Sequence, residues 1–183
     1  MRVIAGSARR LELKTPPGLD TRPTTDRIKE TLFNILQPDL YGCRFLDLFA
    51  GSGQIGIEAL SRGAAYAVFV DKDRTAVGCI RDNLMHTHLA DQAEVVQTDA
   101  VSAIARMQGR QAPFDMVFMD PPYRQGLELP VLLALNGSGL VTGDTTVIVE
   151  AALKDELDFS GSGFAMVRVK EYKTNKHYFL KKV

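Results

Sequence analysis

The chain has 183 residues, 45% of them hydrophobic, which favours one domain with a single core over two domains. No apolar run is long enough to cross a membrane, the start lacks the apolar stretch of a secretion signal, and Cys43 and Cys79 form no CxxC pair. We therefore expect a cytoplasmic protein with two buried free thiols.

The 22 basic and 22 acidic residues cancel, but they are unevenly distributed. Residues 1–44 hold 8 basic and 5 acidic side chains and residues 164–183 hold 6 and 1, whereas residues 45–163 hold 8 and 16. Basic ends on an acidic body favour a polyanion bound by the ends, with solvated terminal charge as the alternative.

The first predicted element is a helix over residues 24–37, which follows a proline- and glycine-rich arm at residues 15–23. Thr24 is the expected N-cap, because it follows a proline and Asp26 stands in the first turn. The helix is amphipathic, and its apolar stripe consists of Ile28, Leu32, Ile35 and Leu36.

From Cys43 onward, short β-branched or aromatic runs alternate with amphipathic segments. The expected strands are residues 43–50, 66–71, 93–99, 114–120 and 145–151, and the expected helices are residues 54–62, 74–86, 100–107 and 127–135. Strands joined by helices require right-handed crossovers, so the pattern predicts an α/β fold with a doubly wound, mostly parallel sheet. Residues 164–172 and 177–183 have no helix between them and predict a closing antiparallel hairpin.

Acidic residues stand at the ends of four of these strands. Asp47 is near the end of the first, and Asp71, Asp99 and Asp120 end the next three. In an open α/β sheet the ligand lies beyond the carboxyl ends of the strands, so these four aspartates are candidate ligand groups. For Asp99, which stands just before a helix, a helix N-cap is an equally good interpretation.

A glycine motif follows the first strand. Gly51-Ser52-Gly53-Gln54-Ile55-Gly56 is a complete GxGxxG that opens a helix, and Asp71 follows Gly51 by twenty residues, where an acid that binds a ribose is expected. Taken alone the motif fits NAD or any other adenosine-containing cofactor. A pyrophosphate among four aspartates would meet like charge, whereas S-adenosylmethionine carries a sulfonium and no phosphate. The aspartates therefore favour S-adenosylmethionine.

The fourth strand continues into Asp120-Pro121-Pro122-Tyr123. Two consecutive prolines fix an extended, rigid backbone directly after a strand. The Asp120 carboxylate and the Pro121 carbonyl can each accept one hydrogen of a planar amino group, and Tyr123 offers a face on which a base can stack. This arrangement suits N-methylation of an aromatic amine, and a proline-rich loop with a structural aspartate is the alternative.

At this point the chain resembles a known family. The segments LDLFAGSGQIGIEALSRGA, FVDKD and FMDPPY resemble motifs of class I S-adenosylmethionine-dependent methyltransferases. With RPTTDRIKETLFNIL, the start MRVIAG and the closing hairpin, the whole chain looks like the RsmD family of 16S rRNA (guanine-N2) methyltransferases. The resemblance implies a single methyltransferase domain over residues 1–183, with a seven-stranded Rossmann-like sheet whose last strand is antiparallel. It also implies that residues 1–42 cover the cofactor and RNA site.

The resemblance also implies roles for individual residues. Gly51–Gly53 would contact the methionine part of the cofactor, Asp71 its ribose and Asp99 the surroundings of its adenine. Asp120, Pro121 and Tyr123 would be the catalytic residues at the target base. The full set implied for the cofactor is Asp47, Phe49, Gly51, Ser52, Gly53, Asp71, Lys72, Asp99 and Ala100, and the set implied for the RNA is Arg22, Thr24, Arg27, Lys29 and Tyr123. Three residues depart from the family pattern: Gln54, Asp71 and Lys173.

The expected activity is methyl transfer to the N2 of a guanine in 16S rRNA, with the small ribosomal subunit or an assembly intermediate as partner. An adenine-N6 methyltransferase is the main alternative, because the DPPY frame, Asp120-Pro121-Pro122-Tyr123, can bind the amino group of any aromatic amine. An NAD-dependent oxidoreductase fits less well, since it should have neutral residues in place of Asp47 and Asp120 and would usually need a substrate domain. A non-catalytic RNA-binding module also fits less well, since it should have lost one of Gly51, Asp71 or Asp120, and all three are present. No metal is expected, because His86 and His88 have no accompanying ligand.

Overall fold

The structure is a computed structural model that describes residues 1–16 and 25–183. Its helices are α1 (Asp26–Leu40), α2 (Gln54–Ser61), α3 (Arg74–His86), α4 (Ala100–Met107) and α5 (Glu128–Gly137), with a short 3-10 turn at Ala90–Gln92. Its strands are β1 (Arg44–Leu48), β2 (Tyr66–Asp71), β3 (Ala93–Gln97), β4 (Met116–Met119), β5 (Thr146–Ala152), β6 (Phe164–Glu171) and β7 (Asn175–Lys182). None of the helices in these ranges has both the length and the apolar character needed to span a bilayer.

The strands form one sheet in the order β3-β2-β1-β4-β5-β7-β6. Strands β1 to β5 are mutually parallel, and β7 runs antiparallel to both β5 and β6. The prediction of a doubly wound α/β sheet closed by an antiparallel hairpin is therefore confirmed. The strand order reverses between β1 and β4, and such a switch point opens a crevice at the carboxyl ends of the two strands.

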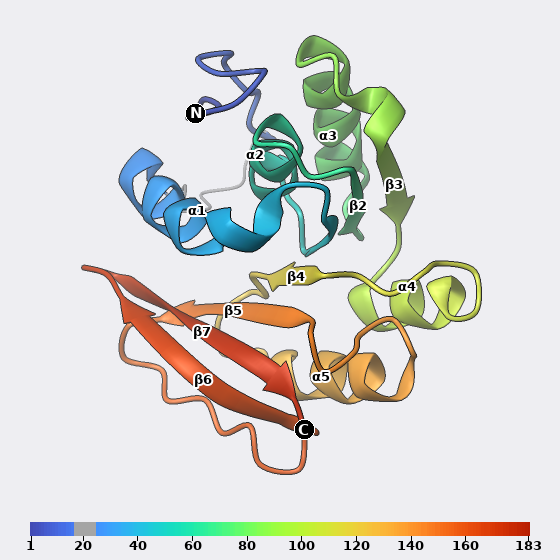
Figure 1. The fold of residues 1–183 in the computed structure, drawn as a ribbon, viewed down its shortest axis with the longest axis vertical. Coiled ribbons are helices and arrows are strands. Elements are labelled where there is room, and N and C mark those ends of the chain that lie inside the picture. Colours follow the sequence, from blue (N-terminus) through green and yellow to red (C-terminus); the bar gives the residue numbers. More distant parts are fainter. Residues whose placement is uncertain (17–24) are drawn as a thin grey trace.

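Helices cover both faces of the sheet. Figure 1 shows α1, α2 and α3 on one face and α4 and α5 on the other. Each face has its own apolar cluster, one centred on residues such as Phe33, Phe45 and Phe69 and the other on residues such as Leu46, Ile104 and Leu135. Because the central strands are buried on both faces, they read in the sequence as continuous apolar runs.

The helix boundaries agree with the predicted ones to within a few residues, with one error at the start of α1. The N-cap is Thr25, whose hydroxyl accepts a hydrogen bond from the Ile28 N–H, so the prediction of Thr24 is wrong. Thr24 itself, Arg22 and most of the predicted arm lie outside the described residues. Cys43 and Cys79 are buried free thiols, as expected, and burial raises the pKa of Cys43 to about 12.

Residues 1–14, which we call the N-terminal strap, pack against α2 and α3. The strap folds back on itself through a bridge between Arg2 and Glu12. Val3, Ala8 and Leu13 are buried in the same cluster as α1 and α2, so the strap belongs to the domain core rather than to its surface.

Candidate active site

The loop between β1 and α2 lies at the switch point, and Asp71 at the end of β2 holds it in place. One Asp71 carboxylate oxygen accepts a hydrogen bond from the Gly51 N–H at 2.8 Å, and the other accepts one from the Asp73 N–H at 2.9 Å. Gly53 is the N-cap of α2 with φ at 77°, a left-handed conformation that favours glycine. Phe49 also has a positive φ, at 62°. The loop is therefore a tight, fixed turn.

Asp47 lies beneath this loop and is buried. Its carboxylate accepts a hydrogen bond from the Gly56 N–H at 2.9 Å, which ties the first turn of α2 to β1. Glycine at position 56 also lets α2 pack closely on the sheet, because a Cβ there would lie 2.3 Å from the Phe69 ring on β2. Burial, with a smaller contribution from Asp71, raises the pKa of Asp47 to about 7 although the Gly56 hydrogen bond opposes the shift. The structure thus gives Asp47 a supporting contact to the loop.

Asp99 is exposed and caps α4. Its carboxylate accepts a hydrogen bond from the Ser102 N–H at 2.9 Å, and hydrogen bonds from Ser102 lower its pKa. The helix-cap interpretation of this aspartate is therefore confirmed, and a carboxylate that caps a helix still has lone pairs for a ligand. Lys72, which follows β2, is exposed, and Ala100, the first residue of α4, is buried.

Asp120 differs from the other three strand-end aspartates. It follows β4 at the switch point, is half-buried, and accepts no hydrogen bond from the described residues. Burial raises its pKa well above the ordinary value, and the charges of Glu150 and Asp47 raise it further. Pro121 is buried and Tyr123 is 41% exposed. A carboxylate on a rigid backbone that no described residue pairs with is available to a ligand.

A fifth strand-end acid, Glu150, was not among the predicted site residues. It is buried near the end of β5, where Asn175 and His177 both contact its carboxylate. Glu150 is the next-to-last residue of TTVIVEA, the segment that predicts β5, so the argument applied to the other four strands would have found it. Its partners on β7 could not be found that way, because the pairing of β5 with β7 depends on the register of the hairpin.

The basic residues predicted to bind RNA are not equivalent in the structure. Arg27 is exposed and makes no ion pair with the described residues, as the prediction requires. Lys29 is fully buried, where its ammonium donates a hydrogen bond to the Arg2 carbonyl at 2.6 Å and lies 3.7 Å from a Glu58 carboxylate oxygen. A buried, paired lysine cannot contact a phosphate, so the RNA-binding role of Lys29 is wrong. Arg22 and Thr24 lie outside the described residues.

The residues at this edge fit S-adenosylmethionine. A Cβ on Gly51 would meet nothing within 4 Å, so there is room above the loop for a ligand to approach the backbone closely. The oxygens of Asp71 and Asp99 can accept bonds from hydroxyl and amino groups, and the N-terminus of α2 favours a carboxylate. The buried acids Asp47 and Glu150 beside Asp120 favour a positively charged group over a phosphate.

Known proteins are similar to this chain in sequence and in structure. The chain matches the family model described as conserved hypothetical protein 95 over residues 1–181. It is 38% identical to the Bacillus subtilis protein YlbH, with 94% of each sequence covered, and 37% identical to the ribosomal RNA small subunit methyltransferase D of Escherichia coli, with 93% of this chain and 84% of the relative covered. The solved structure of the Escherichia coli protein yhhF is similar with a TM-score of 0.86 and 36% identity, over 100% of this chain and 97% of that one.

Proposed function

This chain belongs to the family described as conserved hypothetical protein 95, which includes ribosomal RNA small subunit methyltransferase D, and on that premise we propose that it methylates the N2 of a guanine in small-subunit rRNA. The observation that carries the proposal is the position of Asp120-Pro121. These residues follow β4 at the switch point, beside the glycine loop, and the Asp120 carboxylate has no partner among the described residues.

The cofactor that we propose is S-adenosylmethionine, which supplies a methyl group on a positively charged sulfur when it is bound. Gly51, Ser52 and Gly53 would hold its methionine part at the N-terminus of α2, with Phe49 at the start of the loop. Asp71 would accept hydrogen bonds from its ribose beside Lys72, and Asp99 and Ala100 would flank its adenine. Asp47 would act indirectly, by fixing α2 through the Gly56 N–H.

The target amine would be held by the rigid segment after β4. The Asp120 carboxylate and the Pro121 carbonyl can accept its two hydrogens and leave its nitrogen facing the methyl group, while Tyr123 stacks on the base. The lone pair of this nitrogen is delocalised into the ring, so the enzyme must contribute orientation and exclusion of water. Asp120 also accepts the proton that the amine loses, and no covalent bond to the protein is required.

The RNA would reach the site from the side of α1. We propose that residues 1–42 cover the cofactor and RNA site, and that Arg22, Thr24 and Arg27 contact the RNA beside Tyr123. A single small domain offers little surface for reading bases one by one, so a folded RNA that presents an unstacked nucleotide is the better substrate. The small ribosomal subunit, or an intermediate in its assembly in the cytoplasm, provides such an RNA.

The test is methyl transfer with labelled S-adenosylmethionine to three substrates: naked 16S rRNA, small ribosomal subunits from a strain that lacks this protein, and DNA. Nucleoside mass spectrometry should find N2-methylguanosine in the rRNA, with more product from subunits than from naked RNA. N6-methyladenosine or N6-methyladenine as the product would instead show that the DPPY frame serves an adenine, and absence of transfer to every substrate would overturn the proposal.

A further inference from the structure

A row of polar groups continues from Asp120 across the sheet. Met119 and Val149 are register partners in the parallel pair β4 and β5, and the next residues along the two strands are Asp120 and Glu150. Glu150 in turn pairs with His177 in the antiparallel pair β5 and β7. The two carboxyl groups therefore lie on neighbouring strands, and the charge of Glu150 contributes to the raised pKa of Asp120.

Glu150 is held in place by two side chains of β7. Its carboxylate accepts a hydrogen bond from the Asn175 amide at 2.6 Å and one from His177 Nε2 at 3.0 Å. Because a carboxylate only accepts, Nε2 carries the hydrogen of this contact, and Nδ1 of the same ring lies 3.1 Å from the Tyr172 hydroxyl. Burial raises the pKa of Tyr172 to about 12, so its hydroxyl remains a donor. Glu150, Asn175 and His177 are all at least nine-tenths buried.

The buried polar groups around Glu150 are not needed to pack the hairpin against β5. A buried carboxylate costs free energy unless hydrogen bonds satisfy it, and apolar residues could join β5 to β7 without that cost. The charged and titratable groups that face Asp120 from the described elements are Asp47 on β1 and Glu150 on β5, with His177 and Tyr172 behind Glu150. Both groups with a direct effect on Asp120 are acids, so they favour its protonated form.

We propose that Glu150 is a positioning residue for methyl transfer: anchored by Asn175 and His177, it keeps a negative charge beside Asp120 and makes that carboxylate the stronger proton acceptor. The inference rests on the proposed function. As the new nitrogen–carbon bond forms, the sulfur–carbon bond breaks with its electron pair left on sulfur, and the amine loses one proton to Asp120. Asp120 releases that proton to water after the product leaves.

The direct test measures the pKa of Asp120 by carbon-13 NMR titration of its carboxyl in the cofactor-free protein, with the signal assigned from Asp120→Asn. Glu150→Gln removes the neighbouring charge but keeps an acceptor, and it should lower the pKa of Asp120. Glu171→Gln, which removes an exposed carboxylate from β6, should leave that pKa unchanged. An Asp120 pKa that is the same in Glu150→Gln and in the wild type overturns the proposal.

Two further variants keep the proposal testable if Glu150→Gln fails to fold. His177→Gln keeps an N–H for the Glu150 carboxylate and should retain the wild-type pKa of Asp120. His177→Leu removes that donor, makes Glu150 easier to protonate, and should lower the pKa of Asp120. Equal values in the two variants overturn the proposal.

The same variants separate this inference from the proposed function. In single-turnover transfer to rRNA at saturating cofactor, the rate should rise with pH as Asp120 ionises, and the midpoint of this rise should lie at lower pH in Glu150→Gln. A wild-type protein that transfers no methyl group to rRNA contradicts the proposed function, while the NMR titration still decides whether Glu150 acts on Asp120. If the wild type and Glu150→Gln both transfer the methyl group with the same pH midpoint, only the proposed role of Glu150 is contradicted.

Discussion

Asp47, Asp71, Asp99 and Asp120 are the same residue type at or near the carboxyl ends of four strands, yet their surroundings give them different properties. Asp71 and Asp99 bind backbone N–H groups at the edge of the sheet, and Asp47 does so in the core. Asp120 has no such partner within the described residues. A carboxylate that accepts a backbone N–H contributes to the framework and keeps its remaining lone pairs for a ligand, whereas all the lone pairs of one that no described residue pairs with are open to a substrate.

Replacing Asp120 should separate chemistry from binding. Asp120→Ala should lower the single-turnover rate by orders of magnitude with little change in cofactor affinity, because the residue lies beyond the cofactor at the target amine. Asp120→Asn should be milder, since it keeps one acceptor oxygen. Quench-flow and calorimetry give the two quantities, and equal losses in Ala and Asn would mean that Asp120 acts only through its charge or as an essential base.

Asp71→Ala should weaken S-adenosylmethionine binding by about 1.5–3 kcal/mol, as expected for hydrogen bonds to a charged group. The loss has two sources, because the same carboxylate also holds the Gly51 N–H at 2.8 Å. Isothermal titration calorimetry of the purified protein measures it without any transfer reaction. Unchanged affinity, or comparable binding of NAD, would contradict the cofactor assignment.

Asp47 should make the protein less stable as the pH rises. Its pKa is about 7 in the folded state against an ordinary value of 3.8, so between about pH 4 and pH 7 the folded chain holds a proton that the unfolded chain has lost. Stability falls through that window, by on the order of 4 kcal/mol for a shift of this size, and is level above it. Asp47→Asn should remove this pH dependence in urea unfolding, and parallel curves for variant and wild type would contradict it.

The placement of the four aspartates at strand ends could be predicted, because strands and helices alternate along the chain and each strand can be recognised from its local pattern. The burial of Lys29 could not, because it depends on Glu58, which comes much later in the sequence, and on the carbonyl of Arg2. In the sequence Lys29 resembles any lysine on the polar side of an amphipathic helix. Only the packing of α1 against α2 and the strap shows that it faces inward.

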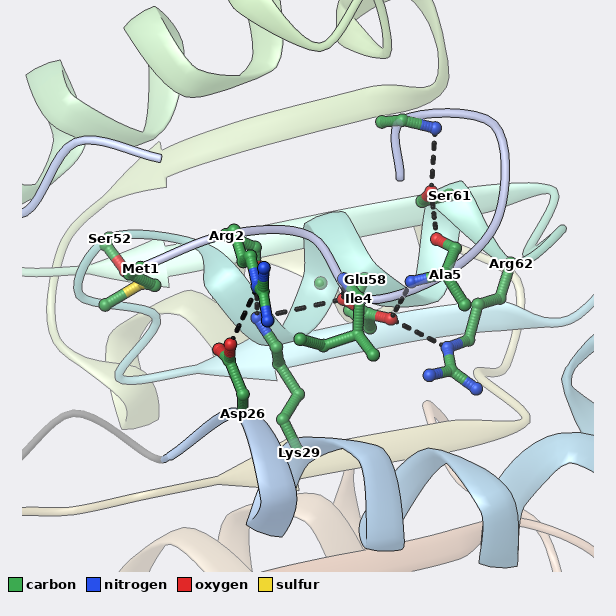
Figure 2. Close-up of polar contacts among 12 residues, drawn as sticks. Met1, Arg2, Ile4, Ala5, Asp26, Lys29, Ser52, Glu58, Ser61 and Arg62 are labelled. Atoms are coloured by element: carbon green, nitrogen blue, oxygen red, sulfur yellow. Dashed lines mark hydrogen bonds and ion pairs between the residues drawn. The ribbon is translucent and has the colours of Figure 1, made fainter. Parts of the chain in front are cut away.

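At the scale of elements, a buried cluster around Glu58 joins three segments (Figure 2). The Glu58 carboxylate on α2 accepts hydrogen bonds from the Ile4 and Ala5 N–H groups of the strap at 2.8 and 3.0 Å and from Arg62 Nε at 2.8 Å, and it lies 3.7 Å from the Lys29 ammonium of α1. The cluster therefore fixes the strap and α1 to the helix that carries the glycine loop.

Glu58→Gln should destabilise the fold by roughly 3–5 kcal/mol, because it leaves the buried Lys29 cation without its partner and weakens the hold on the strap. Urea unfolding measures the loss. The double variant Lys29→Met with Glu58→Gln should recover part of it, since the buried Lys29 cation is then removed and only Arg62 still lacks its carboxylate partner. Arg27→Ala, on an exposed position of the same helix, should stay within about 0.5 kcal/mol of the wild type.

If the single and double variants were equally unstable, the Lys29 charge would not be what Glu58 offsets. The contribution of Glu58 to holding the strap would then come from its hydrogen bonds with Ile4 and Ala5. Limited proteolysis of residues 1–14 distinguishes the two cases, because a strap released from α2 is cleaved earlier than the core.

At the scale of the whole molecule, the basic ends seen in the sequence are partly neutralised in the fold. Arg2 pairs with Asp26, Lys14 with Asp82 and Lys176 with Glu156, in addition to the burial of Lys29. Counting charges along the chain therefore overestimates the surface available to RNA. Neither prediction foresaw the internal pairing and burial of these residues, and Arg27 is one of the exposed cations that remain unpaired among the described residues.

Replacing Arg22 and Arg27 together by Ala should weaken RNA binding and flatten its salt dependence. Each lost phosphate contact reduces the slope of log affinity against log salt by about 0.7–0.9, so two contacts should reduce it by about 1.4–1.8. The matched control is Arg106→Ala with Arg110→Ala, which removes the same charge from exposed positions at α4 and just beyond it. Because α4 covers the opposite face of the sheet from α1, this pair should leave the slope unchanged (Figure 1).

Filter binding of 16S rRNA at several salt concentrations measures both slopes. Equal slopes in the two double variants would mean that the protein attracts RNA by its overall charge and not through the α1 side, and the binding surface would then have to be sought around Lys170 and Lys173.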